Sequence, residues 1–461
     1  MARRIEFLDT TLRDGNKLPF VVLSFRDRVL LARGLERLGV DIIEAGYPIS
    51  STEEVECVEA VCKHVRGPFV SALARALPSD VDQTLDALKS AQKPYLHVFM
   101  PTSAQSLARV VKMKEDEALA AVEKSVRRGK QAGVPVQFTL GEASQANRAF
   151  RGKLIAAACG AGADVISLAD TNGIYTPEDM KEMVAEALAQ TPRVGVHCHN
   201  DLGLATANSL AAIQAGASHV EVTLGGFGER AGNAALEELA FLVTAYAERY
   251  GIAHQIVLGE ISSLSRLFDE MTGVHTHPNK PVIGRCALQP KPANGEPTRG
   301  LPGNLDTLLQ QGSIGAGPEP IREKEDVGAR RFQLESFNVM TGSHTPPVGI
   351  VVIQAGGSRL VQSSPGSGPI DALFRAVDRA LGLSPKLVYY SLFTLSTGPD
   401  APAEVTVTTQ LKGRRFHGRH QSTDVIEASL RAYLKACNEM ADAGALDGGP
   451  EFYVHGEYLW E

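Results

Sequence analysis

The sequence predicts an α/β protein that begins with a (β/α)8 barrel and ends with a smaller α+β domain. Up to about residue 250, strand-like runs alternate with helical patterns; after residue 331, groups of three strands are each followed by one helix. The stretch between these regions is rich in proline and glycine. We therefore expect a catalytic barrel at residues 1–255, a partly irregular linker at 256–330, and a regulatory or dimerisation domain at 331–461.

Eight strand-like segments support the barrel, because a helical pattern of apolar residues follows each of them. They are Ile5–Leu12, Asp41–Pro48, Pro68–Arg75, Tyr95–Pro101, Pro135–Leu140, Val165–Thr171, Val194–Asn200 and His219–Gly225. Strands separated by helices of this length must run parallel, since the crossover uses up the helix. Eight such units in about 250 residues match a closed barrel. The alternative, an open doubly wound sheet, is disfavoured because no glycine-rich phosphate loop follows the first strand.

The C-terminal region contains a twofold repeat of three strands and a helix (βββα). The first unit comprises Phe332–Thr341, Gly349–Ala355, Arg359–Ser363 and the helix Ile370–Leu381; the second comprises Leu387–Leu395, Ala403–Leu411, Arg415–His420 and the helix Thr423–Ala441. Ser422 or Thr423 is expected to cap the second helix. Repeats of this kind stack their sheets on one another, so the domain is a candidate for dimerisation or effector binding.

The composition excludes several classes of protein. Apolar residues make up 44% and charged residues 21%, which is ordinary for a globular protein and excludes a disordered chain. The net charge of −7 predicts no nucleic-acid or anionic-membrane surface. No apolar run reaches the length of a transmembrane helix and no secretory segment is apparent, so we expect a cytoplasmic protein. The six cysteines form no CxxC pair and are expected to be reduced.

Polar residues gather at the C-terminal ends of the predicted strands, where the active site of such a barrel lies. Arg13 and Asp14 follow the first strand, His197 and His199 lie on the seventh, and Asn233 follows the eighth. Two histidines two residues apart on a strand point to the same face, here the barrel interior. With an aspartate across the barrel they predict a divalent-metal site, which an Asn carbonyl and water could complete. The alternative is a hydrogen-bonded core histidine.

Arg13 carries a permanent charge and can polarise a carbonyl oxygen. The alternative for this residue is a structural salt bridge to Glu44 or Glu229. The pattern as a whole predicts metal chelation of a 2-oxo acid, in which Arg13 stabilises the alkoxide that forms on the former keto oxygen.

His97, Thr139 and Thr171 are further polar residues at strand ends. Taken singly they are weak signals. The Thr171 hydroxyl could bind a carboxylate, although a threonine at a strand end is as often a turn former.

Four segments carry a specific resemblance. They read LDTTLRDG at residues 8–15, IEAGYPISS at 43–51, HCHNDLGLA at 197–205 and GERAGNAALEE at 228–238. Together they resemble the family of 2-isopropylmalate, homocitrate and citramalate synthases, and the resemblance covers about residues 4–250. The repeat Phe332–Gly444 is similar to the leucine-binding regulatory domain of isopropylmalate synthases.

The resemblance implies an acyltransferase. In the family, acetyl-CoA is deprotonated at its methyl group, condenses with a 2-oxo acid, and the resulting thioester is hydrolysed. The implied metal ligands are Asp14, His197, His199 and Asn233, and the implied substrate-binding residues are Arg13, His97, Thr139 and Thr171. The metal could be Mg²⁺, Mn²⁺, Zn²⁺ or Co²⁺. A homodimer with an amino-acid effector site in the C-terminal domain is also implied.

Three positions depart from the family pattern. Lys17 stands where the family usually has Gln, and Gly141 where it has a catalytic Glu, so that the neighbouring Glu142 becomes the candidate catalytic carboxylate. The segment Cys286–Gly295 lacks the family's active-site histidine. Two alternatives to an acyl-CoA condensing enzyme therefore stay open. One is a metal-dependent aldolase or lyase that works without CoA, with Lys17 or Glu142 as proton carrier; the other is a non-catalytic regulatory paralogue.

Overall fold

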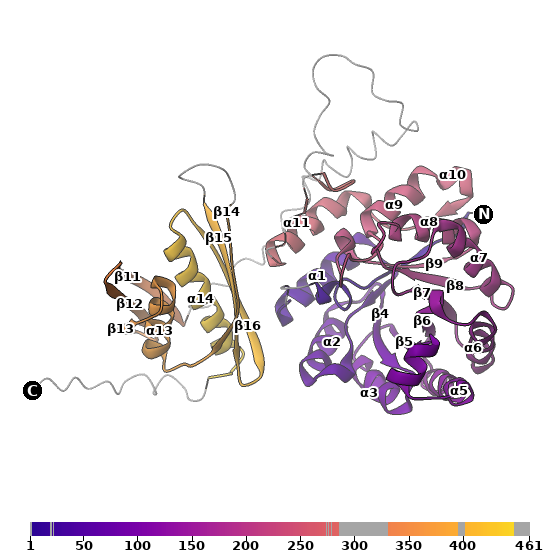
Figure 1. The fold of residues 1–461 in the computed structure, drawn as a ribbon, viewed down its shortest axis with the longest axis horizontal. Helices are drawn as coiled ribbons and strands as arrows, with labels where there is room; N and C mark the ends of the chain where they lie inside the picture. Colours follow the sequence, from indigo (N-terminus) through magenta and orange to yellow (C-terminus); the bar gives the residue numbers. More distant parts are fainter. Residues whose placement is uncertain are drawn as a thin grey trace, which may run out of the picture. The chain divides into compact units, whose positions relative to one another are not determined.

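The computed structural model describes residues 2–18, 21, 23–272, 274, 276–277, 279–284, 331–394 and 402–446. The chain divides into two compact units, Met1–Ile321 and Arg322–Glu461 (Figure 1). Most of the predicted linker, from residue 285 to residue 330, lies outside the described residues. None of the described helices has the length and the apolar run that a membrane span requires.

The first unit is a closed barrel of eight parallel strands, as predicted. The strands are β2 (Glu6–Asp9), β3 (Ile42–Glu44), β4 (Phe69–Arg75), β5 (Pro94–Pro101), β6 (Val136–Gly141), β7 (Val165–Asp170), β8 (Val194–Cys198) and β9 (His219–Val222). They pair in chain order, and β9 pairs with β2 to close the barrel. Seven of them end before the predicted C-terminal limit or at it, because the residues that follow turn into the loops of the barrel mouth.

One main helix follows each barrel strand (Figure 1). The helices are α1 (Phe25–Leu38), α2 (Thr52–His64), α3 (Pro78–Leu88), α5 (Glu115–Gln131), α6 (Arg148–Ala161), α7 (Pro177–Leu188), α8 (Ala205–Ala215) and α9 (Leu236–Ala245). Several begin at a residue that satisfies the free N–H groups of the first turn. In α1, for example, the Asp27 N–H donates to Ser24 Oγ while the Ser24 N–H donates to Asp27 Oδ2.

Further elements pack around the barrel. Between β5 and α5 the chain forms the short helix α4 (Ala104–Ser106) and a π-helical turn at Leu107–Val111. After β10 the helix α11 (Ile261–Thr272) packs against α1. The short strands β1 (Arg3–Arg4) and β10 (Ile252–Ala253) pair with each other, and two-residue strands have no periodicity from which they could be predicted.

Alternation along the strands separates an apolar shell from a polar barrel interior. On β6, Phe138 and Leu140 are fully buried in the apolar core between strands and helices, while Gln137 and Thr139 belong to a polar network inside the barrel. Successive side chains of a strand point to opposite faces. The barrel interior is therefore where buried polar side chains from different strands meet.

The second unit confirms the predicted βββα repeat. Its elements are β11 (Phe332–Gly342), β12 (Thr345–Ala355), β13 (Ser358–Pro365), α13 (Pro369–Leu381), β14 (Lys386–Thr394), β15 (Ala403–Leu411), β16 (Arg414–Ser422) and α14 (Val425–Asp442). Each set of three strands forms an antiparallel sheet. The two helices meet where the rings of Phe374 and Tyr433 stack with centroids 4.1 Å apart.

One detail of this unit differs from the prediction. Asp424 caps α14, and its carboxylate accepts the N–H groups of Ile426 and Glu427. Ser422 instead accepts the Asp424 N–H and donates to Glu427 Oε2. The strand β16 runs to Ser422, so the helix starts later than the sequence pattern suggested.

Candidate active site

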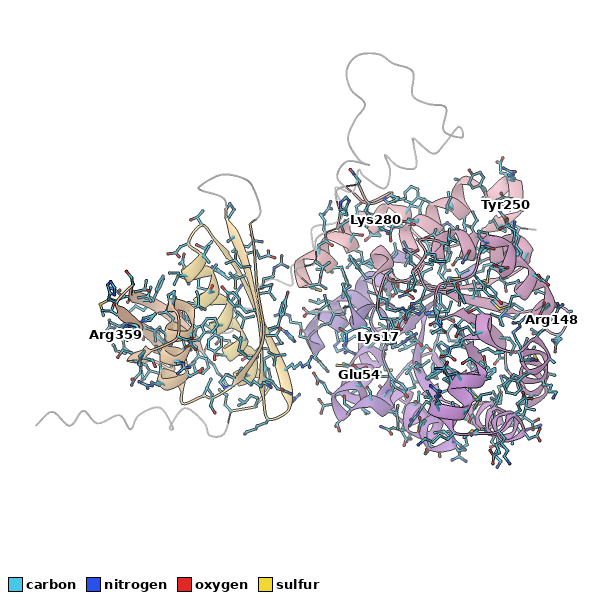
Figure 2. The ribbon with its side chains drawn as sticks, viewed as in Figure 1. Lys17, Glu54, Arg148, Tyr250, Lys280 and Arg359 are labelled. Atoms are coloured by element: carbon cyan, nitrogen blue, oxygen red, sulfur yellow. The ribbon has the colours of Figure 1, made fainter. Side chains whose placement is uncertain are left out.

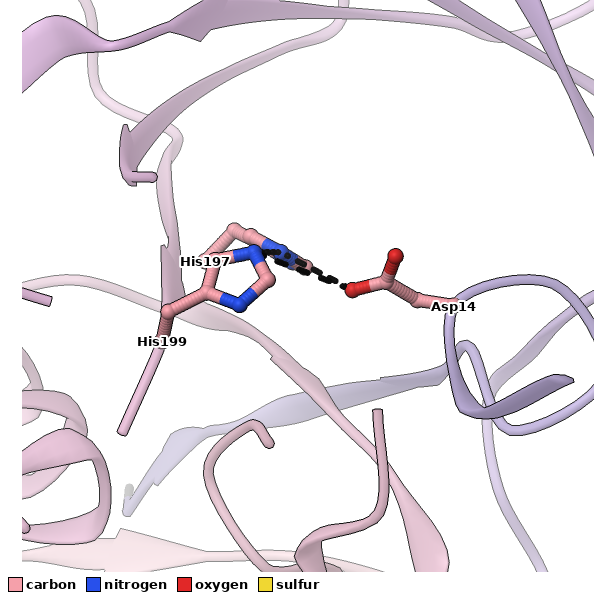
Figure 3. Close-up of side chains that lie close together, drawn as sticks. All are labelled: Asp14, His197 and His199. Atoms are coloured by element: carbon pink, nitrogen blue, oxygen red, sulfur yellow. Dashed lines mark hydrogen bonds and ion pairs between the residues drawn. The ribbon is translucent and has the colours of Figure 1, made fainter. Parts of the chain in front are cut away.

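Asp14, His197 and His199 converge inside the mouth of the barrel (Figure 3). The Nε2 atoms of the two histidines are 3.1 Å apart, and Asp14 Oδ2 lies 3.5 Å from His197 Nε2 and 3.8 Å from His199 Nε2. All three residues are buried. The Asp14 loop follows β2, and the histidines lie at the end of β8, so closure of the barrel brings together two segments far apart in the sequence.

The donor set fits a divalent cation. Asp14 Oδ2 and Asn233 Oδ1 are buried, and neither has a hydrogen-bond partner among the described residues. Asn233 pairs with His199 through an isolated β-bridge and donates its amide to the Phe227 carbonyl, which leaves its oxygen free to accept. Imidazole nitrogens with carboxylate and amide oxygens are a common ligand set for divalent metals.

Electrostatics shift the three side chains of the cluster in different directions. Burial alone would raise the pKa of Asp14, but Arg13, His197 and Lys17 hold it well below its usual range, so the carboxylate is charged. Burial and the nearby His197 lower the pKa of His199 to about 3. Burial opposes charge on His197 as well, but the carboxylates of Glu221 and Asp14 outweigh it and raise the pKa of His197 to about 9.

Glu221 on β9 orients the first histidine. Its Oε2 lies 2.9 Å from His197 Nδ1, and its Oε1 accepts hydrogen bonds of 2.7 Å from both Ser167 Oγ and Gln137 Nε2. Burial would raise the pKa of Glu221, but His197, His97 and the Ser167 hydroxyl hold it below the ordinary range. A carboxylate on the far nitrogen of a metal-binding imidazole fixes the ring and makes it a better ligand.

Arg13 lies beside the cluster and pairs with two carboxylates. Its Nη1 donates to Asp14 Oδ1 over 2.9 Å, and its Nε donates to Glu44 Oε2 over 2.7 Å. The structural salt bridge from Arg13 to Glu44 is therefore present, and the one to Glu229 is not among the ion pairs of the described residues. Burial would raise the pKa of Glu44, but Arg13 and His97 lower it to about 2.

His97 and Thr139 continue this network across the barrel. His97 Nδ1 lies 2.6 Å from Glu44 Oε1, and His97 Nε2 lies 2.7 Å from Thr139 Oγ1. Gln137 Nε2 donates to Thr139 Oγ1 over 3.0 Å. The result is a closed polar ring that runs through Asp14, Arg13, Glu44, His97, Thr139, Gln137, Glu221 and His197.

A cavity of about 420 Å³ opens onto this ring. The predicted residues Arg13, Asp14, His97, Thr139, Glu142, Thr171, His197 and His199 all line it. Asn233 does not; it lines a neighbouring cavity of about 490 Å³ together with the glycine-rich loop that follows β9.

Glu142 sits in a turn of the barrel mouth with a backbone conformation unusual for a residue with a side chain, at φ +56°. Its carboxylate accepts hydrogen bonds from Ser103 Oγ and Ser106 Oγ on the loop after β5. Its N–H donates to Thr171 Oγ1 over 2.8 Å, so the Thr171 hydroxyl keeps its own proton free to donate into the cavity.

Sequence reasoning missed Glu221 and Gln137. Each is a polar residue inside a buried strand, Glu221 in the run His219–Val222 and Gln137 in the run Val136–Leu140. A charged or amide side chain at an inward position of a buried strand was the available signal, because such groups are rarely buried without a partner.

The barrel resembles solved structures in fold. A hydroxymethylglutaryl-CoA lyase from Pseudomonas aeruginosa superposes with a TM-score of 0.51 at 21% sequence identity, covering 60% of this chain and 94% of that one. An HMG-CoA lyase from Brucella melitensis gives a TM-score of 0.51 at 17% identity, covering 59% and 100%. At these identities the likeness establishes the fold alone.

Sequence comparison covers both units. The HMGL-like family matches residues 4–268, and the LeuA allosteric (dimerisation) domain matches residues 321–441. A 2-isopropylmalate synthase from Pyrococcus furiosus is 34% identical, over 95% of this chain and 100% of that protein. The enzyme of the same name from Ruminiclostridium cellulolyticum is 32% identical, over 95% and 97%. The chain therefore belongs to the HMGL-like family and, within it, to the family of 2-isopropylmalate synthases.

Proposed function

We propose that the chain catalyses a metal-dependent Claisen-type condensation, in which the acetyl group of acetyl-CoA is added to the keto carbon of a 2-oxo acid. Hydrolysis of the thioester would complete the reaction, which is that of an acyltransferase converting an acyl group into an alkyl group on transfer. The observation that carries this proposal is the convergence of Asp14, His197 and His199, with the unpartnered Asp14 Oδ2, on the cavity that Arg13 also lines.

The residues around the cavity would have different roles in binding and activating the 2-oxo acid. A divalent cation held by Asp14, His197, His199 and Asn233 would polarise the keto group. Arg13, whose charge is permanent, would stabilise the alkoxide that develops on the keto oxygen. The hydroxyls of Thr139 and Thr171 would bind the substrate carboxylate, and His97, held by Glu44, would fix the orientation of Thr139.

The cavity favours a 2-oxo acid with an apolar side chain. Leu73, Phe99 and Ala169 are among the residues that line it. Glu54 also lines it, paired with Arg28, and this carboxylate would offer no partner to a second carboxylate on the substrate. A branched, uncharged side chain agrees with the name of the curated relatives, 2-isopropylmalate synthase.

The neighbouring cavity would take the acyl donor. Gly225, Gly226 and Gly228 line it beside Lys280, and a loop without side chains lets a ligand approach the backbone closely. Glu142 would act as the acid–base group on the methyl of the donor, since it lines the cavity of the 2-oxo acid and stands next to the position where the family has its glutamate.

A thiol-release assay tests the proposal. Purified protein, stripped of metal and reloaded with Mg²⁺, Mn²⁺, Zn²⁺ or Co²⁺ in separate samples, is given acetyl-CoA and a panel of 2-oxo acids. Metal-dependent release of CoA with 2-oxoisovalerate, and with little release from 2-oxoglutarate, is expected. Cleavage of a 2-hydroxy acid without CoA would favour an aldolase or lyase instead, and binding without any turnover would favour a regulatory paralogue. The comparisons favour the condensing enzyme over both.

The second unit would mediate a homodimer and bind an amino-acid effector. The match to the LeuA allosteric (dimerisation) domain supports both roles. Light scattering at several protein concentrations is expected to give twice the chain mass. A panel of amino acids in a thermal-shift assay is expected to single out a branched one, and a flat response across the panel would overturn the effector role.

A further inference from the structure

Lys17 is a cation at the mouth of the barrel that the proposed chemistry has not yet used (Figure 2). Its Nζ lies 2.9 Å from Asp14 Oδ1 and 3.4 Å from Glu229 Oε2. The Lys17 side chain is 47% exposed, whereas that of Arg13 is 11% exposed and held between two buried carboxylates. Lys17 is thus the more movable of the two cations.

The Lys17–Glu229 ion pair marks the border between the two cavities. Lys17 and Glu229 both line the cavity of the proposed 2-oxo acid. Their neighbours in the chain, Leu18 on one side and Gly228 and Arg230 on the other, line the cavity of the proposed acyl donor. A donor in the second cavity must pass its reacting end across this border to reach a keto carbon at the metal cluster.

The reacting end of the donor becomes negatively charged on the way. When the methyl C–H bond breaks, the proton goes to a base, for which Glu142 is the candidate, and the electron pair forms a carbon–carbon double bond. The carbonyl oxygen of the thioester then carries the negative charge until the new bond to the keto carbon forms. A cation aimed at such a developing oxyanion stabilises the transition state more than the ground state.

We propose that the Lys17 ammonium stabilises the oxyanion that forms on the thioester oxygen of the acyl donor. This inference rests on the proposed function and names a further catalytic residue for its second substrate. Lys17 would reach the oxygen by exchanging its contact with Glu229, the longer of its two ion pairs, for one with the donor. The chain has this cation where its family usually has a neutral glutamine.

Lys17 would also affect metal binding, in addition to its effect on the oxyanion. Because Lys17 contacts Asp14, it withdraws charge from a metal-binding carboxylate and would weaken the hold on a cation. Its removal would then tighten metal binding, which is the opposite of what a structural support for the metal site would do. Metal affinity measured with the metal alone therefore distinguishes the roles.

The test compares Lys17→Gln and Lys17→Arg with the wild-type protein, in the full chain loaded with metal. Exchange of the acetyl-CoA methyl protons for deuterium is followed by mass spectrometry in D2O with saturating 2-oxo acid, and thiol release gives kcat and KM. Lys130→Gln is the matched control, since Lys130 pairs with Asp164 at 2.8 Å and lines neither of the two cavities.

Lys17→Gln is expected to lower methyl exchange and kcat by roughly 10- to 100-fold, with KM for the 2-oxo acid and Mn²⁺ affinity retained or improved. Lys17→Arg should recover part of the rate, and Lys130→Gln should behave as wild type. Equal exchange in Lys17→Gln and wild type, or a loss that tracks weaker Mn²⁺ binding, would overturn the role of Lys17 alone. A wild-type protein that neither exchanges methyl protons nor releases thiol would overturn the proposed function as well.

Discussion

His197 and His199 present their Nε2 atoms to each other at 3.1 Å, in a buried site that Asp14 completes. Burial and the charge of His197 lower the pKa of His199 to about 3, whereas Glu221 and Asp14 raise the pKa of His197 to about 9. Contact this close also carries a charge repulsion whenever both rings are protonated. A cation shared by the neutral rings and the carboxylate would remove it. The arrangement is thus more easily understood as a metal site than as a pair of core histidines.

Loss of one imidazole should weaken metal binding. His199→Gln is expected to weaken the binding of Zn²⁺ or Mn²⁺ by at least about 100-fold, because a ligand is lost while the fold is retained. Titration calorimetry on metal-free protein measures it. The control is His254→Gln, a half-buried histidine bonded to Thr244 outside the site. Equal metal affinities of the wild type and His199→Gln would show that His199 is not a metal ligand.

Glu142 offers a way to separate catalysis from stability. Its φ of +56° suits glycine, so in Glu142→Gly the relief of backbone strain is expected to offset the lost hydrogen bonds from Ser103 and Ser106 and to leave the melting temperature nearly unchanged. Without the carboxylate, kcat should fall by about 10²- to 10⁴-fold, the usual worth of an acid–base group. Lys412→Gly makes the same backbone change at φ +51° in the other unit and should leave kcat unchanged. Full activity in Glu142→Gly would show that another group handles the proton.

Asp378 should make the second unit less stable as the pH rises. Burial raises the pKa of Asp378 to about 6, against the hydrogen bond from Tyr433, so the folded state holds a proton that the unfolded state releases. Stability should therefore fall between about pH 4 and pH 6, by roughly 1–3 kcal/mol. Asp378→Asn should abolish this dependence and slow hydrogen exchange in α13 and α14 at pH 7.5.

The neighbouring Asp371 is the control for this pH effect. The Ser367 N–H lowers the pKa of Asp371, and Arg375 adds to the effect. Its charged form is therefore favoured in the folded state, and Asp371→Asn should speed hydrogen exchange in α13 at pH 7.5. Slower exchange in both variants would contradict the assignment for Asp378.

A glycine sets how closely α14 approaches its sheet. A Cβ on Gly418 of β16 would lie 1.8 Å from the Ala432 carbonyl oxygen, which side chains do not tolerate. Gly418→Ala is expected to destabilise the second unit by at least about 2 kcal/mol, since helix and sheet must separate. Gly368→Ala, where nothing lies within 4 Å of the added carbon, is the matched control in thermal melting. Equal melting of the two variants would contradict the close approach.

Much of the fold could be predicted from the sequence, and the reasons are local. The strand pattern marks β4, β5 and β7 almost to the residue, and the order of elements leaves few topologies open. The end of each strand was harder to predict. β3 spans three residues, where the sequence pattern Asp41–Pro48 suggested eight, because turn residues can be as apolar as the strand before them.

The candidate site could also be predicted only in part. The meeting of Asp14 with His197 and His199 could be predicted, because the strand-end rule of barrels places such residues together without knowledge of any distance. The roles of Gln137 and Glu221 could not, because the sequence does not say which side chains face each other across the barrel interior. The contact of Glu142 with Ser103 and Ser106 depends on loop conformation, which periodicity does not encode.

The polar ring has a consequence for how this barrel can change. Every member contacts two others through a hydrogen bond or an ion pair, so replacing one residue leaves a buried partner on each side without that contact. Paired replacements of two adjacent members, such as Thr139→Val with Gln137→Leu, should cost less than the sum of the single ones. The residues of the polar ring should therefore change together or not at all. Single substitutions between related barrels are expected at residues outside the ring, such as Lys17 and Gly141.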